Sequence, residues 1–552
     1  MMPAKPDGQV PKMRKGLTLS PGARVMGTEI AAGKGSGKTT FLTVLALEDF
    51  LKSYPQVIFD PLGTTSESLL FRISHFLTRV PPALHNRFWE RVRYVDVGAT
   101  DFVTPFPLYY ELGSEPSLRD VAERFLTVVR LANPALTNAP IMGWPAMRRI
   151  GVYTGMILAS LGYQITEAHS LLFDTLEWER SGRFAEAIKR CPEARPAVAF
   201  FRHEYLPTRE AEKSRLITSF LDHIFPFTVD PQLRAVFSGA STPGIDWQIV
   251  ERTGQTVLLD FRNVLEPETR RFAMLWIFSL LYEFIKRRGR SATPFGVIID
   301  EFAALTQQVT AGVNPLAVLL DEFINQYMRN NNIWLTVAHQ SIYQIDEQLR
   351  NTLLSLGNYV IGRAATMEEA RVLADVLFAK DVFRVKHHRK VWGKVDPPPF
   401  PYRSSEYFTS AKLENPNFPY FVLDTEPEFM PLEEQLELFA QQITKLRLFD
   451  FLLRPAEREG QISSSVIPIS IANVVQDRET GAYLFPNQPV VARLRSLLRA
   501  KSGIPIATLL AEQEARCHQR ALQEPRDSGS LPAPEADSER KDPPIQRRER
   551  AS

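Results

Sequence analysis

The stretch Ala32-Gly33-Lys34-Gly35-Ser36-Gly37-Lys38-Thr39 decides the fold of this chain. It matches the phosphate-binding loop pattern, except that Ala32 stands where a first glycine is usual, and alanine keeps the small size. The flanking residues predict a short strand over Arg24 to Ile30, a glycine-rich turn over Ala31 to Lys38 and an amphipathic helix over Thr39 to Lys52. Strand, turn and helix are the context that this loop requires, whereas a flexible surface loop rich in glycine and lysine would need neither neighbour.

The loop predicts ATP and Mg²⁺ as the bound groups. Its glycines let consecutive backbone N–H groups turn toward phosphate oxygens, and the start of the following helix adds a positive dipole end. Lys38 is expected to reach the β and γ phosphates, and Thr39 is expected to ligate Mg²⁺. The predicted nucleotide-binding residues of this segment are Ala32, Gly33, Lys34, Gly35, Ser36, Gly37, Lys38, Thr39 and Thr40.

A phosphate-binding loop needs a metal-side carboxylate at the end of a neighbouring strand. The apolar run Phe295-Gly296-Val297-Ile298-Ile299 is followed by Asp300 and Glu301, and so predicts a strand that ends in two acids. Asp300 is expected to hold Mg²⁺ through water, as a second metal-site residue beside Thr39. Glu301 is expected to polarise the attacking water as a catalytic residue. The alternative is a strand that simply ends in solvated acids.

A further strand, predicted over Ile333 to Ala338, ends in His339-Gln340-Ser341. Because parallel strands end at the same edge of a sheet, the Gln340 amide is expected beside Glu301, where it could sense the γ-phosphate. A single glutamine after a strand is more often an ordinary loop residue. The two preceding motifs favour the catalytic role for Gln340.

Length and composition indicate a large globular protein. A chain of 552 residues predicts several domains, and 44% apolar with 23% charged residues is the ordinary balance. Cys191 and Cys517 are too far apart to suggest a disulfide framework, and neither a secretory signal nor an apolar run of membrane-spanning length is visible, so a cytoplasmic location is expected. The net charge of +2 is too small to indicate a nucleic-acid partner by itself.

Strand and helix signals predict an α/β fold with a central, mostly parallel sheet that an all-helical insert interrupts. Strand signals at Val57 to Asp60 and Arg93 to Val97 precede the helical region. Others follow it at Gln255 to Phe261 and Tyr359 to Gly362. The predicted division is a flexible segment 1–20, core 21–113, helical insert 114–244, core 245–445, a small accessory region 446–522 and a disordered tail 523–552. Within the accessory region the pattern favours a β-rich piece over 466–484 and a helix over 490–520.

Two basic stretches could contact nucleic acid. Lys286 to Arg290 is short, whereas Arg384 to Lys394 interleaves cations with Trp392, as surfaces that follow a strand of nucleic acid do. The second stretch predicts DNA contacts by Lys386, Arg389 and Lys390. A solvated charged loop is an equal alternative for each stretch. We expect no metal site beyond ATP-bound Mg²⁺.

The series of motifs resembles the HerA/FtsK group of hexameric DNA-pumping ATPases, and most closely the coupling proteins of type IV secretion and conjugation. The resemblance runs from Arg24 to Asp424. It rests on the phosphate-binding loop, the turn Asp60-Pro61-Leu62-Gly63, the helical insert, Thr256 to Phe261, Asp300-Glu301, Ala338-His339-Gln340-Ser341 and Leu356-Gly357-Asn358. This chain departs from the group at Ala32 and lacks the paired N-terminal membrane helices common in coupling proteins.

The resemblance implies a RecA-like ATPase core, a homo-hexameric ring and ATP-driven movement of DNA, gripped through its backbone without sequence preference. It also implies that Arg329 reaches the γ-phosphate of a neighbouring subunit. Arg363 is the competing candidate, and a solvated arginine at the end of a helix is the alternative for Arg329. A secretion channel, a relaxase or a nuclease would be the partner. Two other functions stay open: a motor that acts on protein, and a regulatory ATP-binding module, against which Glu301 argues.

Overall fold

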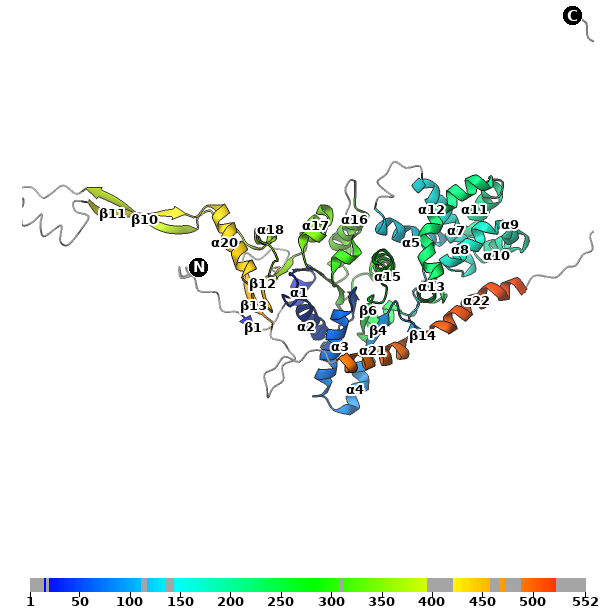
Figure 1. Cartoon of the computed structure of the whole chain (residues 1–552), viewed down its shortest axis with the longest axis horizontal. Coiled ribbons are helices and arrows are strands. Elements are labelled where there is room, and N and C mark those ends of the chain that lie inside the picture. Colours follow the sequence, from blue (N-terminus) through cyan, green and yellow to red (C-terminus); the bar gives the residue numbers. More distant parts are fainter. Residues whose placement is uncertain are drawn as a thin grey trace, which may run out of the picture.

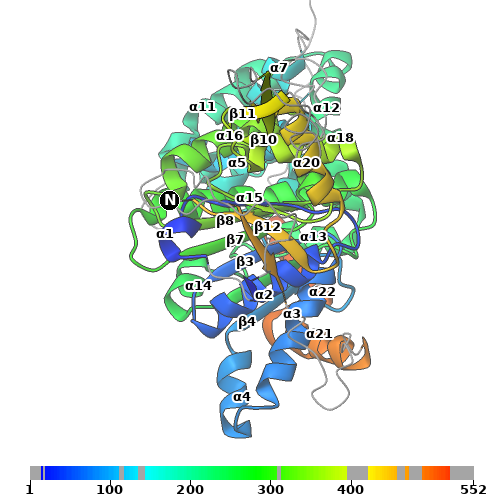
Figure 2. The same cartoon turned by 90° about the vertical axis from the view of Figure 1, so that its left-hand side faces the viewer.

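The computed structural model describes residues 14–15, 19–110, 117–134, 143–306, 312–394, 420–456, 466–471 and 488–522. The predicted flexible segment 1–20 lies mostly outside the described residues, and the predicted tail 523–552 and residues 472–484 lie entirely outside them. The centre of the molecule is one sheet of ten strands with helices on both faces (Figure 1, Figure 2). None of the described helices combines the length and the apolar character needed to cross a membrane.

Seven neighbouring parallel strands form the middle of the sheet. In spatial order they are β9 (Asn358–Ile361), β2 (Thr28–Ala31), β8 (Ile333–His339), β7 (Phe295–Ile299), β3 (Gln56–Asp60), β6 (Thr256–Asp260) and β4 (Val92–Asp96). All their residues are buried except the half-buried Arg93. Parallel strands covered on both faces read as continuous apolar runs, which is why the sequence identified them. The predicted α/β class with a mostly parallel sheet is confirmed.

The edge beside β9 is built by segments from the two ends of the chain. β12 (Asp450–Arg454) pairs antiparallel with β9, and β13 (Ile467–Ser470) pairs antiparallel with β12. The two-residue β1 (Arg14–Lys15) lies parallel to β13. Part of the region after residue 446 therefore belongs to the main sheet.

Helices bury the two faces of the sheet. On one face α2 (Lys38–Leu51) and α3 (Thr64–Leu77) share a core with strand residues such as Ile58. On the other face α15 (Pro267–Arg288) lies along the sheet, and its Phe278 ring packs edge-on against Phe59 of β3, 6.0 Å between ring centroids. Burial of large aromatic side chains on both faces is the main stabilising term for such a layered core.

Between β5 (Phe102–Val103) and β6, the described residues form only helices and short turns. The longer helices are α5 (Leu118–Ala132), α7 (Gly143–Leu161), α10 (Arg183–Arg190), α12 (Glu210–Val229), α13 (Pro231–Ser238) and α14 (Trp247–Thr253); α8 (Ala168–Phe173), α9 (Thr175–Arg180) and α11 (Arg195–Phe200) are shorter. Phe125 of α5 packs on Phe220 of α12 and on Trp276 of α15, so this helical region is joined to the core by aromatic contacts. The predicted all-helical insert is confirmed.

The C-terminal segment runs from the sheet toward the helical region (Figure 1). It consists of α21 (Gln488–Ser502), the two-residue β14 (Ile504–Pro505) and α22 (Ile506–Leu522). α21 packs against β4 and α3, β14 pairs with β5, and α22 lies beside α13. The segment therefore contacts both parts of the molecule.

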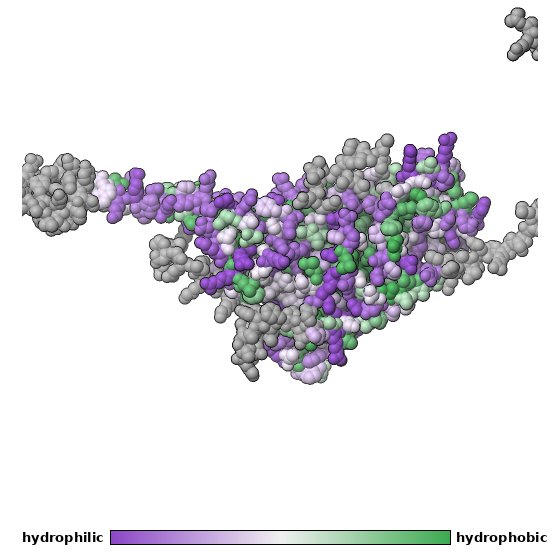
Figure 3. Space-filling model, in the orientation of Figure 1, coloured by the Kyte–Doolittle hydropathy of each residue, from purple (hydrophilic) through white to green (hydrophobic). Residues whose placement is uncertain are grey.

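A long hairpin projects from the body of the molecule (Figure 1). Its strands β10 (Val385–Lys394) and β11 (Tyr420–Phe429) pair antiparallel, and α20 (Leu432–Thr444) joins them to α18 (Met367–Leu377). The alternative that Arg384 to Lys394 is a charged loop is therefore wrong for the backbone, because residues Val385–Lys394 form a strand. The surface of this arm is mainly hydrophilic (Figure 3), which explains why its strands carry no core-facing apolar alternation.

The strand predicted from Arg24 begins four residues later. Residues Pro21–Arg24 form the one-turn helix α1, whose start is capped by Ser20 Oγ accepting from Ala23 N at 3.2 Å. β2 begins only at Thr28. Serine followed by proline is a helix-start signal, and it overrides the apolar pattern of the next residues.

Candidate nucleotide-binding site

The predicted site residues meet at the carboxyl edge of the sheet. β2, β8 and β7 are consecutive in the sheet and parallel, and each is followed there by one of the predicted motifs. The glycine-rich loop follows β2, Gln340 follows β8, and Asp300 and Glu301 follow β7. Ligands of open α/β sheets bind outside the carboxyl ends of the strands.

The loop is anchored at the carboxyl ends of the two strands that flank β2. Ala32 N donates to the carbonyl oxygen of His339 at 3.2 Å, and Gly33 N donates to that of Arg363 at 2.9 Å. A Cβ atom on Gly33 would lie 2.8 Å from the Arg363 carbonyl, so glycine is required for this close approach. Gly37 has φ +101° and caps the start of α2, where side chains other than glycine are strained.

The three charged groups predicted at the phosphates lie in direct contact. Lys38 Nζ is 3.0 Å from Asp300 Oδ1 and 2.5 Å from Glu301 Oε2, and all three side chains are at most 15% exposed. Burial alone would lower the pKa of Lys38, but the attraction of Asp300 and then Glu301 outweighs it and raises the pKa above its usual value. The ammonium group therefore remains charged between the two carboxylates.

Gln340 and Glu301 are brought together as the sequence predicted. Gln340 Nε2 donates to Glu301 Oε2 at 3.1 Å, the same oxygen that contacts Lys38. Glu301 has φ +50°, in the left-handed region that residues other than glycine seldom occupy. Such backbone strain clusters at functional sites.

Thr65 is a site residue that the sequence did not reveal. Its Oγ1 donates to Asp300 Oδ2 at 2.6 Å, and both side chains are buried. Asp300 thus contacts Lys38 through one carboxylate oxygen and Thr65 through the other. The two residues are 235 positions apart; the only local signal is that Thr65 follows the turn Asp60-Pro61-Leu62-Gly63.

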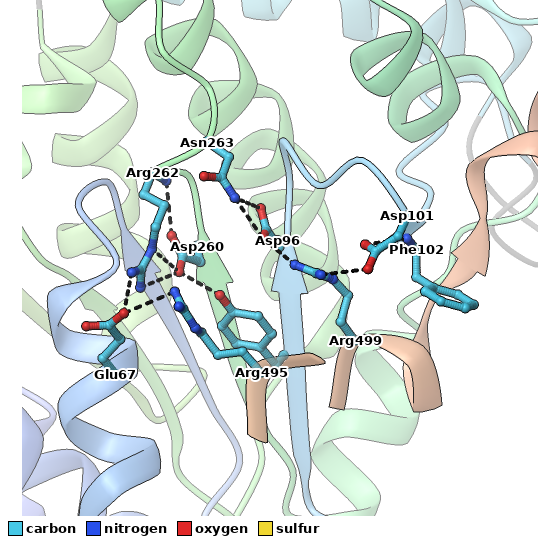
Figure 4. Close-up of polar contacts among 10 residues, drawn as sticks. Glu67, Asp96, Asp101, Phe102, Asp260, Arg262, Asn263, Arg495 and Arg499 are labelled. Atoms are coloured by element: carbon cyan, nitrogen blue, oxygen red, sulfur yellow. Dashed lines mark hydrogen bonds and ion pairs between the residues drawn. The ribbon is translucent and has the colours of Figure 1, made fainter. Parts of the chain in front are cut away.

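A row of aspartates extends along the same edge. Asp60, Asp260 and Asp96 are the last residues of β3, β6 and β4, on the side of Asp300 away from the loop. Burial, followed by the negative charges of Asp260 and Asp300, raises the pKa of Asp60 to about 7. Arg262 contacts Asp260 at 2.7 Å and compensates its charge (Figure 4).

The residues present fit a nucleotide with Mg²⁺. A cation, the Lys38 ammonium, already contacts Asp300 and Glu301, so the carboxylates suit positive charge. Thr39, half-buried in the first turn of α2, supplies a hydroxyl directly after Lys38. Hydroxyl and carboxylate oxygens are the ligands that Mg²⁺ prefers.

The two candidate arginines lie in different places. Arg329 is exposed directly after the π-helix η5 (Phe323–Met328), near the amino end of β8 and so at the opposite edge of the sheet from the loop. Arg363 lies beside the loop, because its carbonyl oxygen accepts a hydrogen bond from the Gly33 N–H group. Its side chain is exposed. Of these two arginines, Arg363 is the one that lies near the site in this chain.

The predicted DNA-contact residues lie on the exposed strand β10, and carboxylates face two of them. Lys386 contacts Glu434 at 2.7 Å, and Arg389 contacts Glu426 at 3.4 Å. Lys390 is exposed on the same strand. Exposed ion pairs are weak, so both cations could exchange partners.

Comparisons with known proteins gave only structural matches. No family model matches the sequence, and no curated protein matches it. The bacterial conjugative coupling protein TrwBdeltaN70 has 13% sequence identity to this chain and a TM-score of 0.46. The match covers 84% of this chain and 90% of the coupling protein. Plasmid coupling protein TrwB in complex with ADP and Mg²⁺ is 13% identical with a TM-score of 0.45, covering 84% and 88%. VirB4 of Thermoanaerobacter pseudethanolicus is 12% identical with a TM-score of 0.42, covering 81% and 89%.

The order of the strands and the geometry of the loop determine the fold of the chain. The predicted resemblance to coupling proteins of conjugation has its counterpart in these similar structures, which include coupling proteins. The chain has an α/β fold with a mostly parallel sheet and a phosphate-binding loop after β2, and the solved structures similar to it include the conjugative coupling protein TrwB and the VirB4 protein.

Proposed function

We propose that this chain is a motor ATPase of the type IV secretion kind that binds ATP and Mg²⁺ and moves DNA in the cytoplasm. One observation carries the ATPase assignment: the Lys38 ammonium lies between Asp300 and Glu301, and Gln340 donates to Glu301. A phosphate-binding lysine, a metal-side acid, a candidate base and a polar sensor are the set that phosphoryl transfer needs.

Each residue has a distinct role in this proposal. The backbone N–H groups of the loop and Lys38 bind phosphate oxygens, which requires Lys38 to leave its carboxylate partners. Thr39 and Asp300 hold Mg²⁺, which when bound offsets phosphate charge. Glu301, freed from Lys38, orients and polarises water, and Gln340 keeps the Glu301 carboxylate in place.

The test separates binding from hydrolysis. Glu301→Gln should bind ATP as the wild type does and lower turnover by about 100-fold or more, because the amide cannot accept a proton. Lys38→Ala should lose ATP binding. Glu48→Gln is the matched control, since Glu48 is half-buried on α2 and pairs only with Lys52 in the described contacts. Wild-type turnover by Glu301→Gln would remove Glu301 as the base.

DNA is the proposed substrate, and the arm is the proposed contact. Binding should be independent of sequence and should fall steeply with salt, because a sliding motor contacts backbone phosphates. Replacing Lys386, Arg389 and Lys390 by glutamine should weaken binding and lower the log–log salt slope by about 1 per lost contact. Replacing the facing acids Glu426 and Glu428 by glutamine should strengthen it.

A motor that acts on protein is the second candidate. The carboxylates that face the cations of β10 favour it, because they reduce the attraction of the arm for phosphates. Filter binding to DNA at two salt concentrations separates the two functions. Retention of DNA that falls with salt would support the DNA motor, and no retention at either concentration would support the protein motor.

The working assembly in this proposal is a homo-hexameric ring in which Arg329 reaches the site of the next subunit. Its position away from the site of its own subunit supports an action between subunits. A secretion channel, a relaxase or a nuclease is the proposed partner. Measuring the mass of the assembly with and without ATP tests the ring directly.

A further inference from the structure

Helix α21, the first helix of the C-terminal segment, packs against β4 and α3 beside the carboxyl end of β4 (Figure 4). Its apolar side chains Val491 and Leu498 are buried there. Two of its arginines point toward acids of this edge: Arg495 contacts Glu67 at 3.0 Å, and Arg499 contacts Asp96 at 2.9 Å. The helix is thus fixed both by apolar burial and by charge.

Glu67 is the point where α21 meets the first turn of α3. Its Oε1 contacts both Arg495 and Arg262, and Arg262 Nη2 also donates to the carbonyl oxygen of Gly63 at 2.6 Å. Any side chain on Gly63 would collide with the Arg262 guanidinium, whose nitrogens lie about 2 Å from an added Cβ. The two arginines therefore hold the turn Asp60–Gly63 and the start of α3 from one side.

The same helical turn supports the metal-side carboxylate. Thr65, two residues before Glu67, donates to Asp300 Oδ2 at 2.6 Å. The Ser66 N–H group donates to Asp60 Oδ2 at 2.7 Å. Since residues of one helical turn move together, a shift of Glu67 would shift Thr65 relative to Asp300. Partners that orient the ligands of a metal contribute strongly to its binding.

We propose that Arg495 is a positioning residue for the ATP site: it holds Glu67, and through the first turn of α3 it holds Thr65 against Asp300. Helix α21 then contributes to the metal side of a site whose residues lie hundreds of positions earlier in the chain. This inference rests on the proposed ATPase function. Arg262 shares Glu67, so loss of Arg495 weakens the support without removing it.

The experiment compares two arginines of one helix. Arg495→Ala should raise the Mg²⁺ concentration for half-maximal ATP turnover by about 3- to 10-fold, less than a direct partner of a ligand would. Arg495→Lys should recover part of the loss, because it can still contact Glu67. Arg493→Ala is the matched control, because Arg493 is exposed on the same helix, and it should behave as the wild type.

A double variant tests the route. If Arg495 acts through Thr65, then Arg495→Ala should add little to the effect of Thr65→Val, because coupled residues are not additive. Additive effects would overturn the proposed route, and so would an Arg495→Ala protein with the Mg²⁺ dependence of the Arg493→Ala control.

Hydrogen exchange provides a readout that needs no nucleotide. In the nucleotide-free protein, the amides of Ser66 and Glu67 should exchange faster in Arg495→Ala than in Arg493→Ala. Equal exchange in the two variants would overturn the positioning role. A wild-type protein that hydrolyses no ATP would refute the proposed function instead, and the exchange comparison would still decide whether Arg495 holds this turn.

Discussion

Replacing Lys38 by alanine should destabilise the protein even in the absence of nucleotide. In the structure this lysine contacts both Asp300 and Glu301, and the three side chains are largely buried. At an effective dielectric constant of about 20, a contact at about 3 Å corresponds to roughly 5 kcal/mol of attraction, from which the desolvation of the groups subtracts. Removing one partner of a buried pair typically costs about 3–5 kcal/mol, because the other charge stays buried.

We expect Lys38→Ala to lower the free energy of unfolding by about 3 kcal/mol, at the low end of that range. The reason is that Glu301 keeps 15% of its side chain exposed and Gln340 still donates a hydrogen bond to it. Urea-induced unfolding of the nucleotide-free protein measures this difference. Lys34→Ala is the control, since Lys34 is exposed in the same loop, and it should change the unfolding free energy by less than about 0.5 kcal/mol.

The pH dependence follows from the raised pKa of Lys38. Its stabilising contribution is complete below the ordinary lysine pKa of 10.5 and is lost only as the pH rises through the still higher value in the folded protein. Between pH 7 and 9 the difference between wild type and Lys38→Ala should therefore be constant. If Lys38→Ala unfolds at the same urea concentration as Lys34→Ala, the reasoning is refuted. The buried carboxylates would then not need the Lys38 ammonium for the stability of the fold.

Three further predictions concern other buried or exposed charges. Asp49→Ala should cost about 3–5 kcal/mol of unfolding free energy, measured with urea, because it leaves the Arg24 guanidinium, buried over Trp334, without its carboxylate. Asp60, with its pKa raised to about 7, binds a proton more readily in the folded state. The wild type should therefore lose stability relative to Asp60→Asn as the pH rises from 4 to 8, by up to about 4 kcal/mol, in urea unfolding at several pH values. Arg329→Ala should bind ATP but hydrolyse it slowly, and mixing it with Lys38→Ala should restore some turnover if the arginine acts between subunits; no loss of turnover would exclude it.

The parallel sheet and the loop could be predicted because their signals are local. Each central strand is a continuous apolar run, and the loop combines glycines with Lys38 in one short segment. The meeting of Gln340 with Glu301 followed from one rule, that parallel strands end at a common edge. This is why two side chains 39 residues apart could be paired before the structure was known.

The features that escaped prediction depend on partners distant in sequence. β10 pairs with β11, whose residues begin 26 positions after the end of β10. Six of the ten residues of β10 are Lys, His or Arg, so its sequence shows no apolar alternation. Thr65 reaches Asp300 across 235 positions, and no spacing of residue types marks that contact. Arg495 reaches Glu67 from even farther. Side-chain contacts of this kind are set by how the elements pack.

The sheet order has a consequence for synthesis of the protein on the ribosome. β2 emerges early, but its neighbours β8 and β9 follow some 300 residues later, with Thr28 paired to Asn358. At about 5–20 residues per second, β2 waits roughly 15–60 s before both of its edges can be covered. During that interval the apolar faces of β2 and α2 are without their final partners, and the unpaired strand edges can bind other chains. The nascent protein should therefore depend on chaperones over that stretch of translation, and synonymous changes that slow translation between residues 60 and 330 should increase its aggregation.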